Sequence, residues 1–178
     1  TPVAVDVSLI VNFPGFKKIS SGLRHTCGLL GDGRAYCWGY GIFGQLGYGD
    51  VISKVRPQLV DTSSIVDFKG FRDLSAGKKH TYGPSGKHHT CGLSDRNKVY
   101  CWGYGANGRL GYGLLSNKTL PYPVNDSSLP LNTFFSTVAA GGEHSCGMLS
   151  NGGGFCWGNG VQGQLGNGTQ FDRLTPVS

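Results

Sequence analysis

Cysteine and histidine stand together at three places in the sequence. Each place reads His-x-Cys, and a second cysteine follows ten residues after the first. The six cysteines are Cys27, Cys37, Cys91, Cys101, Cys146 and Cys156. Cysteines with this spacing could form disulfides, ligate zinc, carry out redox chemistry or remain as small buried thiols.

The residues between each pair of cysteines favour the disulfide. Residues 31–33 separate two short apolar runs and predict a hairpin with a three-residue loop, whose third residue must accept a positive φ. The three copies place Gly33, Asn97 and Gly152 there. Counting outward from the closing pair Leu30–Arg34 sets Cys27 opposite Cys37 at a non-hydrogen-bonded position, with α-carbons about 4.5 Å apart. The same count pairs Cys91 with Cys101, and Cys146 with Cys156.

The other interpretations of the cysteines have weaker support. Structural zinc sites favour closely spaced cysteine doublets, and redox centres favour C-x-x-C; neither spacing occurs in this sequence. Free buried thiols remain an open alternative. We therefore expect three disulfides, no metal site and an oxidising compartment.

A glycine motif, Gly39-x-Gly41-x-x-Gly44, matches the dinucleotide-binding pattern and recurs from Gly103 and from Gly158. That pattern needs a helix directly after it, whereas the residues that follow are rich in glycine. We interpret the glycines as architectural, allowing tight turns and close chain crossings. No nucleophile elbow, paired-carboxylate or metalloprotease motif occurs, so we predict no catalytic residue, no cofactor and no enzyme.

The motifs belong to a threefold repeat. Residues 27–49, 91–113 and 146–168 align without gaps, and each is preceded by an aromatic residue and a short strand. This pattern predicts an all-β chain with repeats at 1–60, 61–124 and 125–178. Within each repeat we expect a tryptophan (Trp38, Trp102, Trp157) and a leucine (Leu46, Leu110, Leu165) to fill the core, and the histidine before the cysteine to make a structural hydrogen bond. The chain starts and stops at the same phase, which suggests three whole repeats of a longer array.

The second repeat carries an insertion near 78–89. It concentrates positive and titratable side chains: Lys78, Lys79, His80, Lys87, His88 and His89. A solvated loop is one interpretation, and a contact site for an anionic partner is the other. The whole chain has a formal net charge of +6, which permits several classes of anionic partner and selects none.

Three sequons, at Asn117, Asn125 and Asn167, could carry N-linked glycans. No apolar stretch is long enough to span a bilayer. Together with the cysteine pairs, the sequons predict a secreted or cell-surface protein.

The segment GLRHTCGLLGDGRAYCWGYGIFGQLGYGD closely resembles the repeat of the regulator of chromosome condensation family. The resemblance covers all three copies and implies β-propeller blades of four antiparallel strands. Because propellers have about four to eight blades, three repeats imply an incomplete propeller that is completed by self-association or by further chain. We expect a non-enzymatic scaffold that binds a protein or an anionic glycan, with nucleic acid not favoured. The alternative is an intracellular guanine-nucleotide exchange factor or chromatin adaptor of the same family.

Overall fold

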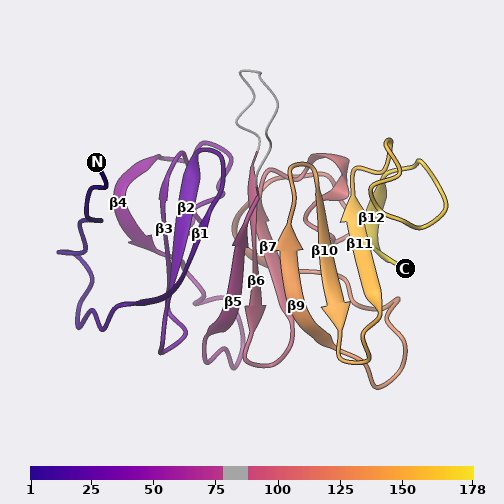
Figure 1. Cartoon of the computed structure of the whole chain (residues 1–178), viewed down its shortest axis with the longest axis horizontal. Coiled ribbons are helices and arrows are strands. Elements are labelled where there is room, and N and C mark those ends of the chain that lie inside the picture. Colours follow the sequence, from indigo (N-terminus) through magenta and orange to yellow (C-terminus); the bar gives the residue numbers. More distant parts are fainter. Residues whose placement is uncertain (78–87) are drawn as a thin grey trace.

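The computed structural model describes residues 1–77 and 88–178 and contains three four-stranded antiparallel sheets (Figure 1). Each sheet is built from four consecutive strands, and we number the sheets 1 to 3 in chain order. Sheet 1 comprises β1 (Phe16–Ser21), β2 (His25–Leu30), β3 (Ala35–Gly39) and β4 (Lys54–Leu59). Sheet 2 comprises β5 (Phe71–Ala76), β6 (His89–Ser94), β7 (Val99–Gly103) and β8 (Lys118–Pro123). Sheet 3 comprises β9 (Phe135–Ala140), β10 (His144–Leu149), β11 (Gly154–Gly158) and β12 (Arg173–Val177). The all-β, three-repeat prediction is confirmed, and the sheets fall within the predicted segments 1–60, 61–124 and 125–178.

The central hairpin of every sheet follows the predicted turn. In sheet 1 the amide of Leu30 donates to the carbonyl of Arg34 at 2.9 Å, which closes a three-residue loop. The third loop residue has a positive φ in each copy: 86° at Gly33, 61° at Asn97 and 86° at Gly152. The β2–β3 register therefore sets Cys27 opposite Cys37, as the turn predicts.

The sheets lie side by side in chain order, from sheet 1 on the left of Figure 1 to sheet 3 on the right. Their first strands are in contact from sheet to sheet: β1 packs against β5, and β5 packs against β9. Polar contacts join these strands: Lys18 of β1 pairs with Asp73 of β5. Arg72 of β5 donates to the carbonyl of Phe135 in β9 at 3.3 Å.

The apolar core lies between the sheets. One cluster combines Cys27, Leu29 and Leu46 of sheet 1 with Leu74 and Trp102 of sheet 2. The equivalent cluster combines residues of sheet 2 with Phe135 and Trp157 of sheet 3. Trp102 and Trp157 are fully buried and fill the core as predicted, and that core is shared between sheets: Trp102 packs with Phe71 of its own sheet and lies in one cluster with Leu46 of the first repeat. Trp38, which has no preceding sheet in this structure, is only half-buried.

Candidate functional site

Three disulfides brace the three central hairpins. They join Cys27 to Cys37, Cys91 to Cys101 and Cys146 to Cys156, with Cα–Cα separations of 4.1, 4.1 and 4.0 Å. The first two disulfides are fully buried, with all four cysteines at 0% exposure. Cys146 and Cys156 are half-buried. The difference arises because each of the first two disulfides is covered by the following sheet.

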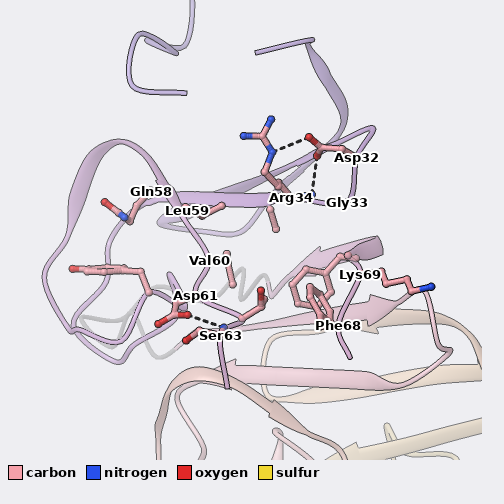
Figure 2. Close-up of a pocket in the computed structure, with 15 residues that line it drawn as sticks. Asp32, Gly33, Arg34, Gln58, Leu59, Val60, Asp61, Ser63, Phe68 and Lys69 are labelled. Atoms are coloured by element: carbon pink, nitrogen blue, oxygen red, sulfur yellow. Dashed lines mark hydrogen bonds and ion pairs between the residues drawn. The ribbon is translucent and has the colours of Figure 1, made fainter. Parts of the chain in front are cut away.

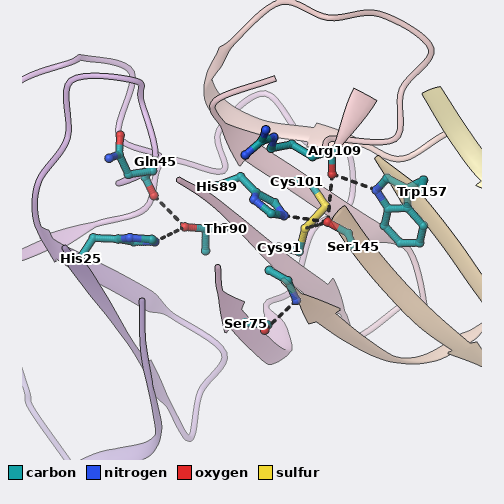
Figure 3. The surroundings of a disulfide bond; sticks show 11 residues. His25, Gln45, Ser75, His89, Thr90, Cys91, Cys101, Arg109, Ser145 and Trp157 are labelled. Carbon is teal, nitrogen blue, oxygen red and sulfur yellow. Dashed lines mark hydrogen bonds between the residues drawn. A yellow bond between two sulfur atoms is a disulfide. The ribbon is translucent and has the colours of Figure 1, made fainter. Parts of the chain in front are cut away.

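A hydrogen-bonded cluster spans each junction between sheets, beside the disulfide (Figure 3). At the first junction the backbone carbonyl of Gln45 accepts from Trp102 Nε1 at 3.0 Å and from Thr90 Oγ1 at 2.8 Å. The same hydroxyl lies 2.9 Å from His25 Nε2. The cluster therefore links β2 and the Gln45 loop of sheet 1 to β6 and β7 of sheet 2.

The second junction repeats this cluster. The carbonyl of Arg109 accepts from Trp157 Nε1 at 3.0 Å and from Ser145 Oγ at 2.9 Å, and His89 Nε2 lies 2.7 Å from that hydroxyl. Ser145 Oγ also lies 3.7 Å from Cys91 Sγ. His25 and His89 make the structural hydrogen bond that the sequence predicts, and the partner hydroxyl of each belongs to the next sheet.

The arrangement fixes the tautomer of the two bonded histidines. A hydroxyl has one hydrogen, and Thr90 donates it to a carbonyl, so the hydroxyl must accept from His25. Nε2 of His25 is therefore protonated and Nδ1 is bare, and the same reasoning applies to His89. Both Nδ1 atoms are buried without a hydrogen-bond partner in the described part of the chain.

Burial keeps these histidines neutral. It lowers the pKa of His25 to about 3, with repulsion from His88 as a smaller cause. It also holds the pKa of His89 well below its usual range, with Arg109 as the next cause. The pKa of His144, in the third sheet, is lowered less completely by the same two effects, burial first and Arg109 second. The junction histidines are thus hydrogen-bond donors rather than charged groups or general bases at neutral pH.

Arg109 occupies the position at which the other repeats have glutamine, and it adds a buried cation to the second junction. Its side chain is 1% exposed. The guanidinium donates to the carbonyl of Gly142 at 3.0 Å and to Asn107 Oδ1 at 3.0 Å, and it lies 5.0 Å from the ring centre of Tyr104. Burial lowers its pKa, and the nearby Glu143 carboxylate opposes that shift. Arg109 therefore ties sheet 2 to sheet 3 by side chain as well as by backbone.

Glycine makes the close packing of the tryptophans possible. A Cβ on Gly47 would lie 2.5 Å from Trp102 Nε1, and one on Gly111 would lie 2.6 Å from Trp157 Nε1. Because real Cβ atoms do not approach so closely, only glycine fits under each indole. This explains two of the repeated glycines as architecture, in agreement with the sequence interpretation.

A pocket of about 550 Å³ opens where sheet 1 meets the segment that leads to sheet 2 (Figure 2). Three of its charged groups have partners: Asp32 pairs with Arg34 at 2.8 Å, and Asp61 Oδ1 accepts from the backbone amide of Ser63 at 2.9 Å. Val60 and Phe71 form an apolar wall. The pocket therefore offers binding space between sheet 1 and the segment that leads to sheet 2.

The corresponding region of sheet 2 carries cross-contacts that the pocket lacks. Lys98 pairs with Asp126, where sheet 1 has Arg34 and Thr62 at the aligned positions. The ring of Tyr122, which aligns with Gln58, packs 4.9 Å from the ring of Tyr112. These contacts distinguish sheet 2 from the region of sheet 1 that lines the pocket.

The predicted binding insertion is only partly described. Lys78, Lys79, His80 and Lys87 lie outside the described residues, and a contact role for them stays a prediction. His88 and His89 are 1% and 0% exposed, so the structure corrects their assignment to an exposed contact site. They align with Arg24 and His25 of the first repeat, and His89 begins β6. The insertion therefore ends before them.

The three sequon asparagines use their side-chain oxygens in local turns. Asn117 Oδ1 accepts from the amide of Gly105 at 3.0 Å, and Asn125 and Asn167 accept from the amide two residues onward at 3.0 and 3.2 Å. Asn117 and Asn125 are exposed and Asn167 is half-buried. In the residues that the structure covers, no hydrogen bond occupies the amide nitrogens, where a glycan would attach. Glycosylation at these positions stays a prediction.

Among the described residues, no group of three or more histidine, cysteine or carboxylate side chains is placed to hold a metal ion. No helix in the described ranges is long and apolar enough to cross a membrane.

Comparison with known sequences identifies the repeat. Two family models, both described as the regulator of chromosome condensation (RCC1) repeat, match residues 16–45 and 135–164, and residues 32–83 and 96–148. The chain is 30% identical over 161 residues to the ultraviolet-B receptor UVR8 of Arabidopsis thaliana. It is 34% identical over 159 residues to the E3 ubiquitin-protein ligase HERC2 of Homo sapiens. These alignments cover 90% and 89% of this chain but only 33% and 3% of the relatives, so the chain spans a third or less of each.

A solved structure gives the same family assignment. Prp20p from Saccharomyces cerevisiae, described with its binding properties to Gsp1p and histones, superposes with a TM-score of 0.72 at 25% identity. The superposition covers 91% of this chain and 37% of Prp20p. Prp20 has also been solved with Kap60 bound. The family models, the four-stranded sheets and this superposition agree, and the chain belongs to the RCC1-repeat family of β-propellers, of which it forms a partial propeller with three blades.

Proposed function

We propose that this chain is a non-catalytic, disulfide-braced propeller segment that acts as a protein-binding scaffold outside the reducing cytosol. The observation that carries the proposal is the placement of the cysteine pairs. All six cysteines are disulfide-bonded, and four of them are fully buried at the junctions that hold the sheets together. Disulfides persist in secreted and cell-surface proteins and are rare in the cytosol.

The disulfides strengthen units that are otherwise small. Each one closes a loop between cysteines ten residues apart, which corresponds to about 2–3 kcal/mol of stabilisation by loop-closure entropy. A bare two-stranded hairpin is marginal in water. The disulfides therefore stabilise each central hairpin and, with it, the loops that connect its strands to the rest of the sheet.

Those loops supply a surface suited to protein contact. The segments between the third and fourth strands of each sheet expose large apolar side chains at related positions: Ile42, Ile52, Leu114, Leu115, Val161 and Phe171. Apolar side chains gathered on equivalent loops are a common mark of protein interfaces. The relatives support the same role, since Prp20 is described with protein partners. The anionic-glycan partner rests on the insertion alone and is the less supported choice.

The compartment is tested by peptide mapping of protein recovered from its natural source and alkylated before any reduction. We expect three disulfide-linked peptides, each joining two cysteines of one repeat, and N-glycan mass on peptides with Asn117 or Asn125. Alkylated free thiols at these cysteines would overturn the proposal and favour the intracellular alternative. Accelerated nucleotide release from a Gsp1-type GTPase would argue for that alternative directly.

A further inference from the structure

The pocket at the first junction is bounded by sheet 1, by the start of sheet 2 and by the segment that connects them (Figure 2). Its apolar lining includes Ala35, Val60 and Phe71, each 3% exposed, and the half-buried ring of Phe68. Its volume of about 550 Å³ falls within the range of about 300–1,000 Å³ that is usual for ligand sites. The pocket is therefore large enough to accept an aromatic ring.

The second repeat shows which group lies at the aligned position. In sheet 2 the ring centres of Tyr112 and Tyr122 are 4.9 Å apart. Lys118 Nζ lies 4.7 Å from the first ring centre and 4.1 Å from the second. Such contacts are favourable because the face of an aromatic ring is negative and its edge is positive. Sheet 2 thus supplies a second ring from its own chain.

Sheet 1 repeats the tyrosine and the cation of this group but not the second ring. Lys54 Nζ lies 4.9 Å from the ring centre of Tyr48. Gln58 stands where sheet 2 has Tyr122, and Gln58 and Tyr48 both line the pocket. The Gln58 carboxamide makes no hydrogen bond in the described part of the chain. Sheet 1 therefore presents a ring, a cation on that ring and an open space beside it.

A carboxylate lies next to this tyrosine. The amide of Asp61 donates to the carbonyl of Gly47, the neighbour of Tyr48, at 2.9 Å. Two hydrogen bonds from Ser63, the side-chain bond first and the backbone bond second, hold the pKa of Asp61 below its usual value. The carboxylate is therefore ionised at neutral pH.

The charge of Asp61 is not neutralised by a cation within the described residues. The other charged groups of the lining are engaged or distant: Asp32 and Arg34 pair with each other at 2.8 Å. Figure 2 shows the side chain of Lys69 directed away from Asp61. The end of the pocket near Asp61 is thus complementary to a positive charge.

We propose that this pocket binds an aromatic side chain of a partner protein, at a point where the next residue of the partner is lysine or arginine. The ring packs against Tyr48, as Tyr122 does against its own tyrosine in sheet 2, and turns its negative face to the Lys54 ammonium. The basic neighbour pairs with Asp61. The Gln58 carboxamide, which has a donor and an acceptor, bonds to the partner's peptide group. The inference rests on the protein-binding role proposed above and names the chemistry of the partner.

Binding is tested by NMR titration of the isotopically labelled 178-residue chain with blocked dipeptides. The probes are N-acetyl-Tyr-Lys-amide, N-acetyl-Tyr-Glu-amide and N-acetyl-Ala-Lys-amide, which differ from one another in charge or in the ring. Tyramine, which has the ring and an amine but no peptide group, distinguishes a free aromatic amine from a protein segment. All chains are produced in the bacterial periplasm, where disulfides form and N-glycans are not added.

Two variants remove the two features of the pocket separately. Gln58→Tyr places in sheet 1 the residue that sheet 2 has, and its control is Val66→Tyr, at a residue that is 86% exposed and outside the lining. Asp61→Asn removes the charge and keeps the turn, because the aligned Asn125 accepts the amide two residues onward at 3.0 Å. Asp95→Asn, at an exposed hairpin residue, is its control.

We expect the parent chain and both controls to bind the Tyr-Lys probe with a dissociation constant on the order of 1 mM, with saturable shifts at the amides that line the pocket. The other three probes should bind at least about threefold more weakly. Gln58→Tyr should weaken the Tyr-Lys probe by at least about tenfold, because its own ring takes the space. Asp61→Asn should weaken that probe by about two- to fivefold and abolish the preference over Tyr-Glu.

Binding of the Tyr-Lys probe that survives Gln58→Tyr, or shifts that do not saturate, would overturn the inference. Equal affinity of the parent for Tyr-Lys and Ala-Lys would contradict the aromatic anchor, and equal affinity for Tyr-Lys and Tyr-Glu would contradict the role of Asp61. Tyramine that binds as tightly as the dipeptide would assign the pocket to a free aromatic amine and exclude the protein segment.

These results are separable from the test of function. A chain with three disulfides that binds none of the probes removes the pocket inference alone. Reduced cysteines in the natural protein would remove the extracellular scaffold and leave the binding of the probes intact.

Discussion

Sheets 2 and 3 share one sequence pattern but have different surroundings. Sheet 2 is covered on both sides, and its two cysteines, its tryptophan and the histidine of its His-x-Cys motif are all fully buried. Sheet 3 is covered only by sheet 2, so Trp157 is buried while its cysteines and His144 are half-buried. The residues of a single repeat therefore do not bury that repeat's own cysteines and histidine. The neighbouring sheet covers these side chains, so their environment is set by the junction between two sheets.

The largest expected effect is a difference in the free energy of unfolding between alanine variants of two tryptophans. Trp102→Ala should lower the free energy of unfolding by about 3–5 kcal/mol, because it empties a fully packed site and leaves the Gln45 carbonyl with one donor. Trp38→Ala should cost roughly half of that or less, since part of its ring is already in water. Urea unfolding, followed by tryptophan fluorescence and circular dichroism, measures both. Equal losses of unfolding free energy for the two variants would show that packing at the junction does not determine how much each tryptophan stabilises the chain.

Acid should weaken the junctions through the buried histidines. Above about pH 6.5 these histidines are neutral in both the folded and the unfolded chain, so pH has little effect through them. Below that value the unfolded chain takes up protons first, because the folded pKa values of His25 and His89 are lowered. The free energy of unfolding should therefore fall by about 1.4 kcal/mol per pH unit for each histidine. For His25 the fall continues towards pH 3.

The check is a series of urea unfolding curves from pH 7.5 to 4.5, compared between the parent chain and His25→Gln. The variant should be less stable at pH 7.5 and should show a shallower decline with acid, since one of the titrating groups is gone. An unchanged slope would contradict the assignment of His25 as a buried neutral donor.

A smaller effect compares two threonines. Thr90→Val removes the hydroxyl that His25 donates to and leaves a buried N–H unpaired, which should cost about 1–3 kcal/mol. Thr26→Val changes the aligned residue on the outer face of sheet 1, where no such bond exists, and should stay within about 0.5 kcal/mol. Urea unfolding of the two variants tests this pair. A comparable cost at Thr26 would mean that the hydroxyl matters within its own sheet.

Local features were predictable from the sequence because they depend on a few adjacent residues. The turn type fixed by Gly33, Asn97 and Gly152 sets the hairpin register, and the register sets the disulfides. The links from His25 to Thr90 and from His89 to Ser145 join residues 65 and 56 positions apart. They follow from how the sheets stack, which a repeat pattern alone does not specify.

The same distinction explains what the sequence left out. Burial of Trp102 and Trp157 was predictable, whereas the share of their core that the preceding sheet supplies follows from how the sheets stack. His88 and His89 were counted with the insertion because of their charge class. Their alignment with Arg24 and His25 was the available signal that they belong to the strand region instead.

The most direct test of the central claim is the order in which the disulfides are reduced. The folded chain is treated with a water-soluble thiol, quenched by alkylation at intervals and mapped by mass spectrometry. If the neighbouring sheet confers burial, Cys146–Cys156 should open first, and Cys27–Cys37 and Cys91–Cys101 should follow much more slowly. Reduction of all three at one rate in the folded chain would contradict the account.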